Sequence, residues 1–555
     1  METLPQELFD TIVSLVCELE ESQRLPSLAT VSRRWQHFIE SRTFRALQLD
    51  SSQLPELGSR FSGLLGHRAA VVTEITCDMV LPSCGDDEVH ERETEQDVWN
   101  YSRAISRQLH DIFGFLLILE KARSHRKGPP VELCLWTVKA PTDMDLQKQD
   151  PDRFHDEEHT DGWQQRGCAD WYWSRRWRYS VHELLAKEAE ALPTISCITR
   201  FAVYNGSKQR QLRCGDWVRI AMKFLHLEHL RLEFREYRAN GKSLRRCVRK
   251  DFADSLLDLA NRYPSTLDKV SITRNFSDTR DEAMPQIDYG HDDNGNDTLS
   301  KALCRLGEKC PRLELEGLNI APELLWPSAW SNIKTVDIEF DPIAPNGEWY
   351  FTTADGSDIP PPEPEAEEPE FSDDEERALY EEFNRSSPTP YELGPARPPS
   401  EAESWCTDEE DPNFCERRYR VRPYNRTINP LLIAAAKAVR CMPLLDWFSM
   451  HTRKQLKPIP SDDRNKLGDE RKFAVTFVPK GSGLPGLRYS WEDKAELAWD
   501  ALPEGVWRPD KEVREEWAKT VGEEGLVCYI YGDKWGRGGS LRWDTLSCEE
   551  FLQKD

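Results

Sequence analysis

Apolar residues recur at helical spacing in the first fifty residues of the chain. The run that starts at Leu4 predicts a first helix, with Pro5 near its first turn, where a missing N–H costs nothing. The three apolar stripes of this region are Leu4, Leu8, Ile12 and Leu15; Leu28, Val31, Trp35 and Phe38; and, in a shorter third stripe, Phe44 and Leu47. Three such short helices cannot close a dry core alone. Their surplus apolar face is therefore expected to need a partner.

A longer unit recurs further along the chain. It consists of an apolar helical stripe, a residue followed by proline, and a short strand with apolar residues three and two positions apart. The proline ends each helix and allows the next strand to begin. Three copies are present, at 252–259, Pro264 and 267–272; at 299–306, Pro311 and 315–320; and at 432–439, Pro443 and 445–450. Similar strand patterns lie at 72–77, 198–203, 227–232 and 333–338. Their uneven spacing indicates a degenerate α/β array with long insertions.

The largest insertion is acidic. The chain has 555 residues and a formal net charge of −25, and residues 355–417 alone hold 21 acidic and 4 basic residues, or −17 of that charge. Such a stretch has little apolar surface to bury, so we expect it to be disordered. A strand at 333–340 and a helix at 429–441 flank it, which predicts that it interrupts one repeat. Ser372 and Thr407 each precede an acidic run and resemble acidic-directed kinase sites, although a solvated spacer explains the same composition.

After the last copy, a strand at 473–478, a helix around 513–517 and a strand at 527–531 are expected to form a C-terminal cap. The predicted organisation is a helical segment at 1–50, the repeat region at 51–354, the disordered insertion at 355–417, and the last repeat with its cap at 418–555.

Composition and motifs argue against several classes of function. The fifteen cysteines form no CxxC pair, and no secretory signal or apolar stretch of membrane-spanning length is present, so we expect a soluble protein of the cytoplasm, the nucleus or both. The acidic charge argues against sequence-independent nucleic-acid binding. No cofactor is expected, because the glycine run at 481–486 lacks the following helix of a dinucleotide site. No metal is expected either: His155 and His159 lie in a polar stretch, and the run from Asp292 to Gly295 lacks the first and last ligands of a calcium loop.

One segment combines aromatic rings with arginines and is the candidate surface for binding a substrate. Tryptophan and arginine dominate interface hot spots, and the two also pair through cation–π contacts. The candidate residues are Trp171, Trp173, Arg175, Arg176, Trp177 and Arg178. The alternative is that the rings belong to a core and the arginines face solvent.

The N-terminal pattern resembles an F-box. Leu4-Pro5-Gln6-Glu7-Leu8 opens it, and Val31-Ser32-Arg33-Arg34-Trp35 followed by Ile39 closes it, although the first connection is a few residues longer than in the family. The resemblance implies docking on the Skp-type adaptor of an SCF ubiquitin ligase. The residues it assigns to that interface are Leu4, Pro5, Leu8, Ile12, Leu15, Leu28, Val31, Ser32, Trp35 and Ile39. An ordinary helical hairpin that caps a larger domain is the alternative.

The whole chain resembles the leucine-rich class of F-box proteins. Residues 300–550 are also similar to a region of filamentous-fungal F-box proteins of unknown function. The residues that carry this second resemblance are Leu325-Trp326-Pro327, Trp330 and Gly347-Glu348-Trp349-Tyr350-Phe351. This resemblance implies a degenerate leucine-rich-repeat-like solenoid behind a three-helix F-box. It also implies a non-catalytic adaptor, with Skp-type and cullin partners, that presents an unknown protein substrate for ubiquitin transfer. A scaffold or regulator acting outside the ligase, or an enzyme with an unrelated N-terminal hairpin, are the alternatives.

Overall fold

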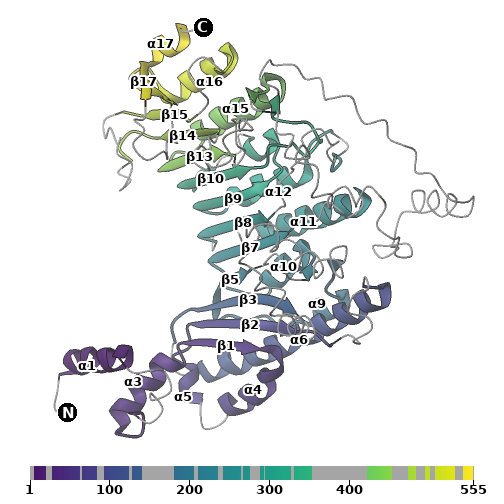
Figure 1. Cartoon of the computed structure of the whole chain (residues 1–555), viewed down its shortest axis with the longest axis vertical. Helices are drawn as coiled ribbons and strands as arrows, with labels where there is room; N and C mark the ends of the chain where they lie inside the picture. The colour runs from purple at the N-terminus through teal and green to yellow at the C-terminus, as the bar shows by residue number, and fades with distance from the viewer. Residues whose placement is uncertain are drawn as a thin grey trace, which may run out of the picture. The chain divides into compact units, whose positions relative to one another are not determined.

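The computed structural model describes residues 5–19, 28–62, 66–83, 93–123, 128–139, 181–204, 210–235, 242–263, 267–275, 288–292, 294–326, 330–352, 420, 422–452, 473–482, 494–500, 507–531 and 542–553. Over these residues the chain is an α/β protein with a mixed, mostly parallel sheet of 13 strands in the order β1-β2-β3-β5-β7-β8-β9-β10-β13-β14-β15-β16-β17 (Figure 1). The chain divides into two compact units. The first comprises residues 1–212 and 219–232, and the second comprises residues 213–218 and 233–555.

The first unit contains the N-terminal helices and a run of parallel strands. Its strands are β1 (Ala46–Asp50), β2 (Glu74–Val80), β3 (Val131–Lys139), β5 (Ile198–Val203) and the start of β7 (His229–Arg235). Its helices include α1 (Gln6–Leu19), α3 (Arg33–Thr43), α4 (Leu54–Ser62), α5 (Gly66–Ala69), α6 (Glu95–Arg123) and α9 (Ala186–Ala191). A separate parallel pair joins β4 (Val181–His182) to β6 (Gln211–Leu212).

The second unit alternates helices with parallel strands and ends in a partly antiparallel region. Its parallel strands β8 (Lys269–Asn275), β9 (Arg312–Leu318), β10 (Thr335–Phe340) and β13 (Trp447–His451) are neighbours in that order. Antiparallel pairing then joins β13 to β14 (Ala474–Val478), β14 to β15 (Glu496–Asp500), and β16 (Leu526–Tyr531) to β17 (Arg542–Ser547). Its helical elements include α11 (Lys242–Arg262), α12 (Thr298–Gly307), η4 (Pro322–Leu325), α15 (Asn425–Arg440), α16 (Lys511–Val521) and α17 (Cys548–Gln553), and α10 (Cys214–Ala221) begins in this unit.

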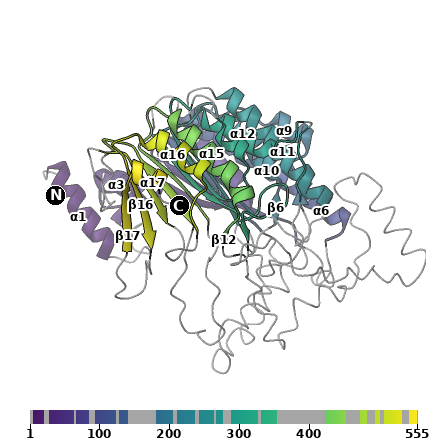
Figure 2. The same cartoon turned by 90° about the horizontal axis from the view of Figure 1, so that it is seen from above.

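Several helices of each unit lie on one face of its strands, α6 and α9 in the first unit and α11, α12, α15 and α16 in the second, whereas α1 and α3 lie apart from that face (Figure 2). Side chains therefore alternate along the strands between a face buried under helices and a polar face, as in β2, where Ile75, Cys77 and Met79 are buried. A parallel sheet usually has both faces covered and carries continuous apolar runs. The apolar triplets of this sequence instead match strands such as β2 and β9, in which buried side chains alternate with more exposed ones.

A short antiparallel pair closes the base of the acidic insertion. Strand β11 (Phe351–Thr352) pairs with β12 (Arg422–Pro423), with Phe351 opposite Pro423. The Arg420 guanidinium donates to the Phe351 carbonyl at 3.2 Å and lies over the Trp349 ring. We call this pair the neck. Phe351 and Pro423, on either side of the acidic insertion, therefore lie side by side.

The helices and strands that the repeated pattern predicted are present. The three helix–proline–strand copies correspond to α11 and β8, α12 and β9, and α15 and β13, and the other four strand patterns correspond to β2, β5, β7 and β10. The strand β10 and helix α15 flank the acidic run as predicted, and β10 pairs with β13 beyond it. In the C-terminal part, β14, α16 and β16 were predicted, whereas β15, β17 and α17 were not.

The third N-terminal helix is a wrong prediction. Phe44 ends α3 as its C-cap, and Leu47 lies in β1, which pairs in parallel with β2. The alternation of Leu47 and Leu49 with Gln48 fits a strand better than a helix, and pairing with β2 then fixes that choice. Among the described residues, no helix is long and apolar enough to cross a membrane.

Candidate functional site

The N-terminal hairpin of α1 and α3 has a small closed core of its own. Phe9 and Val13 from α1 pack against Trp35 and Ile39 from α3, and all four are buried. The Phe9 and Trp35 rings meet edge to face, with their centroids 5.5 Å apart. Leu28, Ala29 and Phe38 pack around these four residues. Ser32 starts α3 as its N-cap, where its hydroxyl accepts from the Trp35 N–H at 3.4 Å.

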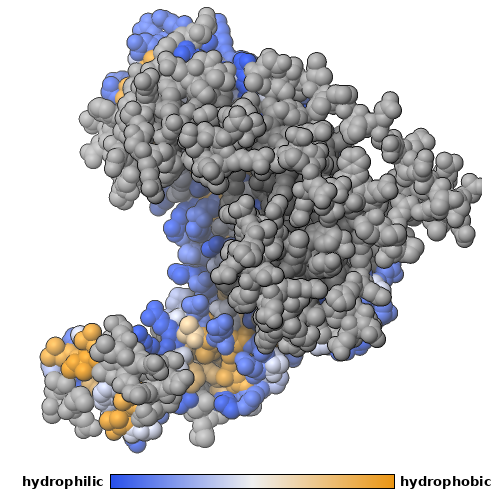
Figure 3. Space-filling model, in the orientation of Figure 1, coloured by the Kyte–Doolittle hydropathy of each residue, from blue (hydrophilic) through white to orange (hydrophobic). Residues whose placement is uncertain are grey.

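A second apolar stripe on α1 stays open. Leu8 is 54 % exposed, Ile12 38 % and Leu15 52 %, and Val31, just before α3, is 60 % exposed. Because a helix turns by roughly 100° per residue, this stripe lies beside the stripe of Phe9 and Val13. We call Leu8, Ile12, Leu15 and Val31 the open apolar face; Figure 3 shows hydrophobic surface on the N-terminal part of the chain. Helix α1 thus has more apolar surface than α3 covers.

The structure divides the predicted adaptor residues into two sets. Leu8, Ile12, Leu15 and Val31 are available to a partner, whereas Trp35 and Ile39 are buried in the hairpin core and support the face from inside. The remaining predicted residues have other positions: Pro5 is exposed and its carbonyl accepts from Phe9, Leu28 is half-buried, Ser32 is the N-cap, and Leu4 lies outside the described residues.

Charged groups fix the hairpin locally. The Arg34 guanidinium lies 4.1 Å from the centroid of the Phe9 ring. Glu40 of α3 pairs with Arg68 of α5 at 2.6 Å, and neither side chain is more than one-fifth exposed. This ion pair joins α3 to α5.

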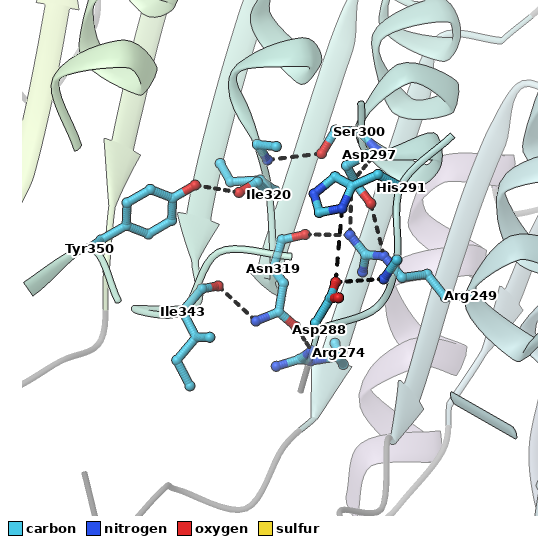
Figure 4. A network of polar contacts seen from close by, with 12 residues as sticks. Arg249, Arg274, Asp288, His291, Asp297, Ser300, Asn319, Ile320, Ile343 and Tyr350 are labelled. Carbon is cyan, nitrogen blue, oxygen red and sulfur yellow. Dashed lines mark hydrogen bonds and ion pairs between the residues drawn. The ribbon is translucent and has the colours of Figure 1, made fainter. Parts of the chain in front are cut away.

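A second candidate site lies where parallel strands of the second unit end (Figure 4). Ligands of open α/β sheets bind at the carboxyl ends of their strands, so open polar groups at this edge would indicate a ligand site. Arg274 is at the end of β8, Asn319 follows β9, and Asp341 follows β10. Arg249 reaches them from α11, and Asp297 is the N-cap of α12. All five side chains are buried.

The groups of this edge bind one another. Arg249 donates to both carboxylate oxygens of Asp297, at 3.1 and 2.8 Å, and to the Asn319 carbonyl at 2.9 Å. Arg274 donates to the Asn319 side-chain oxygen and to Asp341, and the Asn319 amide donates to the Ile343 carbonyl at 2.8 Å. Two cations are therefore neutralised by two carboxylates without any ligand. We call this set the carboxyl-edge lock, and its role is to hold loops in place.

The lock extends through hydroxyl groups. Asp297 also accepts from the Ser300 N–H at 2.8 Å, and Ser300 accepts from the Ala321 N–H at 2.9 Å. The Tyr350 hydroxyl donates to the Ile320 carbonyl at 2.6 Å, and burial raises the pKa of this phenol. The hydroxyl therefore stays protonated and serves as a donor. None of these residues was predicted as part of a site from the sequence; in the carboxyl-edge lock only Asn319 and Asp341 come directly after a strand.

Asp292, which begins the sequence run that resembles a calcium loop, binds the ammonium group of Lys301. Asp292 accepts from the Lys301 amine and from the backbone N–H groups of Asn294 and Asn296, both at 2.9 Å. These donors, with the Lys301 hydrogen bond the largest cause, lower the pKa of Asp292 to about 2. Lys301 thus supplies the positive charge at this carboxylate. Among the described residues, no group of three or more His, Cys, Asp or Glu side chains is placed to hold a metal ion.

The first unit contains a buried cluster around Glu93. Its carboxylate accepts from Arg210 at 2.6 Å and lies 3.5 Å from His182 Nε2, and the Tyr101 ring meets the imidazole edge to face. Burial, the largest cause, lowers the pKa of His182, so the imidazole is neutral. A histidine beside a carboxylate is the arrangement of a general base, but no Ser, Thr or Cys side chain is recorded in contact with this imidazole among the described residues.

Several predicted residues lie outside the described residues. They include the whole aromatic and arginine segment from Trp171 to Arg178, the histidines His155 and His159, the phosphorylation candidates Ser372 and Thr407, and most of the glycine run at 481–486. Comparison with known proteins gave no match to a family model, to a curated protein or to a solved structure.

Proposed function

We propose that this chain is a non-catalytic substrate adaptor of an SCF-type ubiquitin ligase, in which the α1–α3 hairpin is an F-box that docks on a Skp-type linker. The observation that carries the proposal is the open apolar face. The hairpin core is complete without Leu8, Ile12, Leu15 and Val31. A contiguous apolar face that is not needed for folding is typical of an interaction site.

The geometry suits a helix docked in a groove of a partner. Leu8, Ile12 and Leu15 follow one another at intervals of four and three residues, which gives successive anchors along one side of α1. Full burial of side chains of this kind contributes roughly 1.5–3 kcal/mol each. The four anchors are already partly buried in the hairpin, so their further burial contributes only part of this free energy, and contacts around them must supply the rest of the cost of association.

The helix–strand units beyond the hairpin are, in this proposal, a degenerate leucine-rich-repeat-like region that binds the substrate. Their support is the succession of helices and mostly parallel strands, with buried and exposed side chains alternating along strands such as β2 and β9. Ubiquitin transfer needs an acceptor lysine held near the charged carrier enzyme, so the adaptor supplies position and no reacting group. The cullin and the linker complete the assembly, in the cytoplasm or nucleus.

The test places a charge on the open apolar face and a matched charge elsewhere on the hairpin. Leu8→Asp and Val31→Asp each place an unpaired carboxylate in the proposed interface and should abolish capture of a Skp-type linker in a pull-down. His37→Asp places the same charge on an exposed position of α3 and should leave capture intact. Circular dichroism must show that all three variants are folded.

Normal capture by Leu8→Asp would refute the F-box assignment. Linker capture without copurifying cullin would instead favour a scaffold or regulator that works outside the ligase. Trp35→Ala distinguishes the residues of the hairpin core from those of the open apolar face. It removes a core side chain, so it should lower the stability of the hairpin as well as capture of the linker.

A further inference from the structure

The buried histidine of the first unit holds a short strand pair against helix α6. His182 is the last residue of β4, which pairs in parallel with β6 through two residues of each strand. Its imidazole is fully buried, and the Tyr101 ring of α6 meets it edge to face, with the ring centroids 5.9 Å apart. Two such short strands are at best marginally stable by themselves. Contacts with α6 are therefore needed to keep the pair in place.

Backbone hydrogen bonds join the residues after His182 to the same helix. The N–H of Glu183 donates to the Ser102 hydroxyl, and the N–H of Leu185 donates to the Ser106 hydroxyl, both at 3.2 Å. Ser102 and Ser106 are buried one turn apart on α6. The exchange of these two amide protons with solvent therefore reports whether the segment lies against α6.

The charges around the imidazole are balanced while it is neutral. Glu93 Oε1 accepts from the Arg210 guanidinium at 2.6 Å, and Glu93 Oε2 lies 3.5 Å from His182 Nε2. The Arg210 guanidinium also lies 4.8 Å from the centroid of the Tyr101 ring. Among the described residues, Glu93, Arg210 and Tyr101 are the charged and titratable groups that face the imidazole. Protonation of His182 would therefore give this buried cluster a net positive charge.

Burial makes that extra charge unfavourable, because a buried ion without its own counterion loses its hydration. Burial is the largest cause that lowers the pKa of His182; Glu93 raises this pKa, and Arg210 lowers it. When the segment leaves α6, the imidazole enters water and regains the ordinary histidine pKa of about 6.5. Acid therefore favours the arrangement in which the segment has left the helix.

We propose that His182 is an acid-sensitive switch, whose protonation releases β4 and residues 183–185 from α6 while the large sheet remains folded. Its size follows from proton linkage. If the imidazole is protonated only after release, the equilibrium constant for release rises about thirtyfold between pH 7.5 and pH 5. The inference goes beyond the adaptor proposal and does not depend on it, because the α1–α3 hairpin contributes no residue to this cluster.

The experiment measures hydrogen exchange of the full chain by mass spectrometry at pH 7.5 and pH 5, with each rate divided by the intrinsic exchange rate at that pH. Protection of the Glu183 and Leu185 amides should fall about thirtyfold at the lower pH. His182→Gln and His182→Phe each replace the imidazole with a group that does not titrate, so the change in either variant should be less than about threefold. The phenyl ring keeps the aromatic contact with Tyr101.

Two controls show whether the effect is specific. His110→Gln removes another histidine of α6, which pairs with Glu188 at 2.8 Å, and should leave the thirtyfold change intact. The Ser300 and Ala321 amides of the second unit, which donate to Asp297 and Ser300, should keep their protection at both pH values. None of the five side chains of the carboxyl-edge lock is a histidine.

Four results would overturn the proposal. The first is a wild-type change below about threefold at Glu183 and Leu185, and the second is the full change in both His182 variants. The third is an equal fall at Ser300 and Ala321, which would show unfolding of the whole chain. The fourth is loss of protection at pH 7.5 in both His182 variants, because a neutral side chain should fill the same site.

Discussion

Removing Asp297 should destabilise the second unit more than any other single change to the carboxyl-edge lock. This carboxylate neutralises the buried Arg249 and also caps α12 through the Ser300 N–H. A buried charge left without its partner costs about 3–5 kcal/mol, and a lost N-cap costs about 1 kcal/mol. Asp297→Ala should therefore lower the free energy of unfolding of the second unit by about 4–6 kcal/mol.

Two further variants separate these contributions. Asp297→Asn keeps an oxygen for the cap but removes the charge, so its cost should be about 3 kcal/mol, from the unpaired Arg249 alone. Arg249→Met combined with Asp297→Asn removes both charges of the pair. Replacing both partners of a buried ion pair is often nearly neutral, so the double variant should be more stable than Asp297→Asn.

The assay is urea unfolding followed by circular dichroism, with hydrogen exchange of α12 and β9 peptides to locate the effect. Exchange should rise first at α12, because its cap is lost. A cost below about 1 kcal/mol for Asp297→Ala, or a double variant less stable than Asp297→Asn, would show that the pair is not the closed, desolvated contact described above.

Three other predictions follow from the same structure. Ser32→Ala removes the N-cap of α3 and should cost about 1 kcal/mol, measured as faster hydrogen exchange of α3, and unchanged exchange would contradict the cap. Burial lowers the pKa of His182 in the folded state, so below the ordinary histidine pKa of about 6.5 the unfolded chain binds more protons than the folded one. The free energy of unfolding should therefore fall as pH drops through that value. His182→Gln should flatten this pH dependence, as urea unfolding at several pH values would show. Limited proteolysis within residues 355–417 should give two fragments that elute together in gel filtration, because β10 and β13 pair across the cut, and separate elution would refute that reasoning.

The sequence predicted the positions of strands better than it predicted the elements that pack beside them. Apolar triplets such as that of Val270 and Ile272 mark strands because one sheet face is buried under helices, and in the three repeat copies a proline separates the helix from the strand. Strand β3 and helix α6 were missed, although Pro129 and Pro130 stand between them. At Leu47 the choice between helix and strand was set by pairing with β2, which lies 28 residues away in register.

The candidate site was predicted in part, for a related reason. Periodicity placed Leu8, Ile12 and Leu15 on one helical face, but it could not tell an open stripe from the buried one that contains Phe9 and Val13. The F-box resemblance assigned Trp35 and Ile39 to the same interface, whereas both are buried in the hairpin core. The carboxyl-edge lock was beyond sequence reasoning, because Arg249 and Asp297 are 48 residues apart and charged residues are ordinarily expected in solvent.

The neck determines how changes in the length of the acidic insertion affect the stability of the fold. Strands β11 and β12 hold the two ends of the acidic insertion side by side. For the disordered insertion that the composition predicts, the free energy of closing the loop depends only on the logarithm of its length. Doubling or halving the insertion alters stability by about 0.6 kcal/mol, less than a single core substitution. Selection for fold stability therefore places almost no limit on the number of residues between Thr352 and Arg422. That part of the chain is free to gain and lose sequence while the sheet on either side keeps its register.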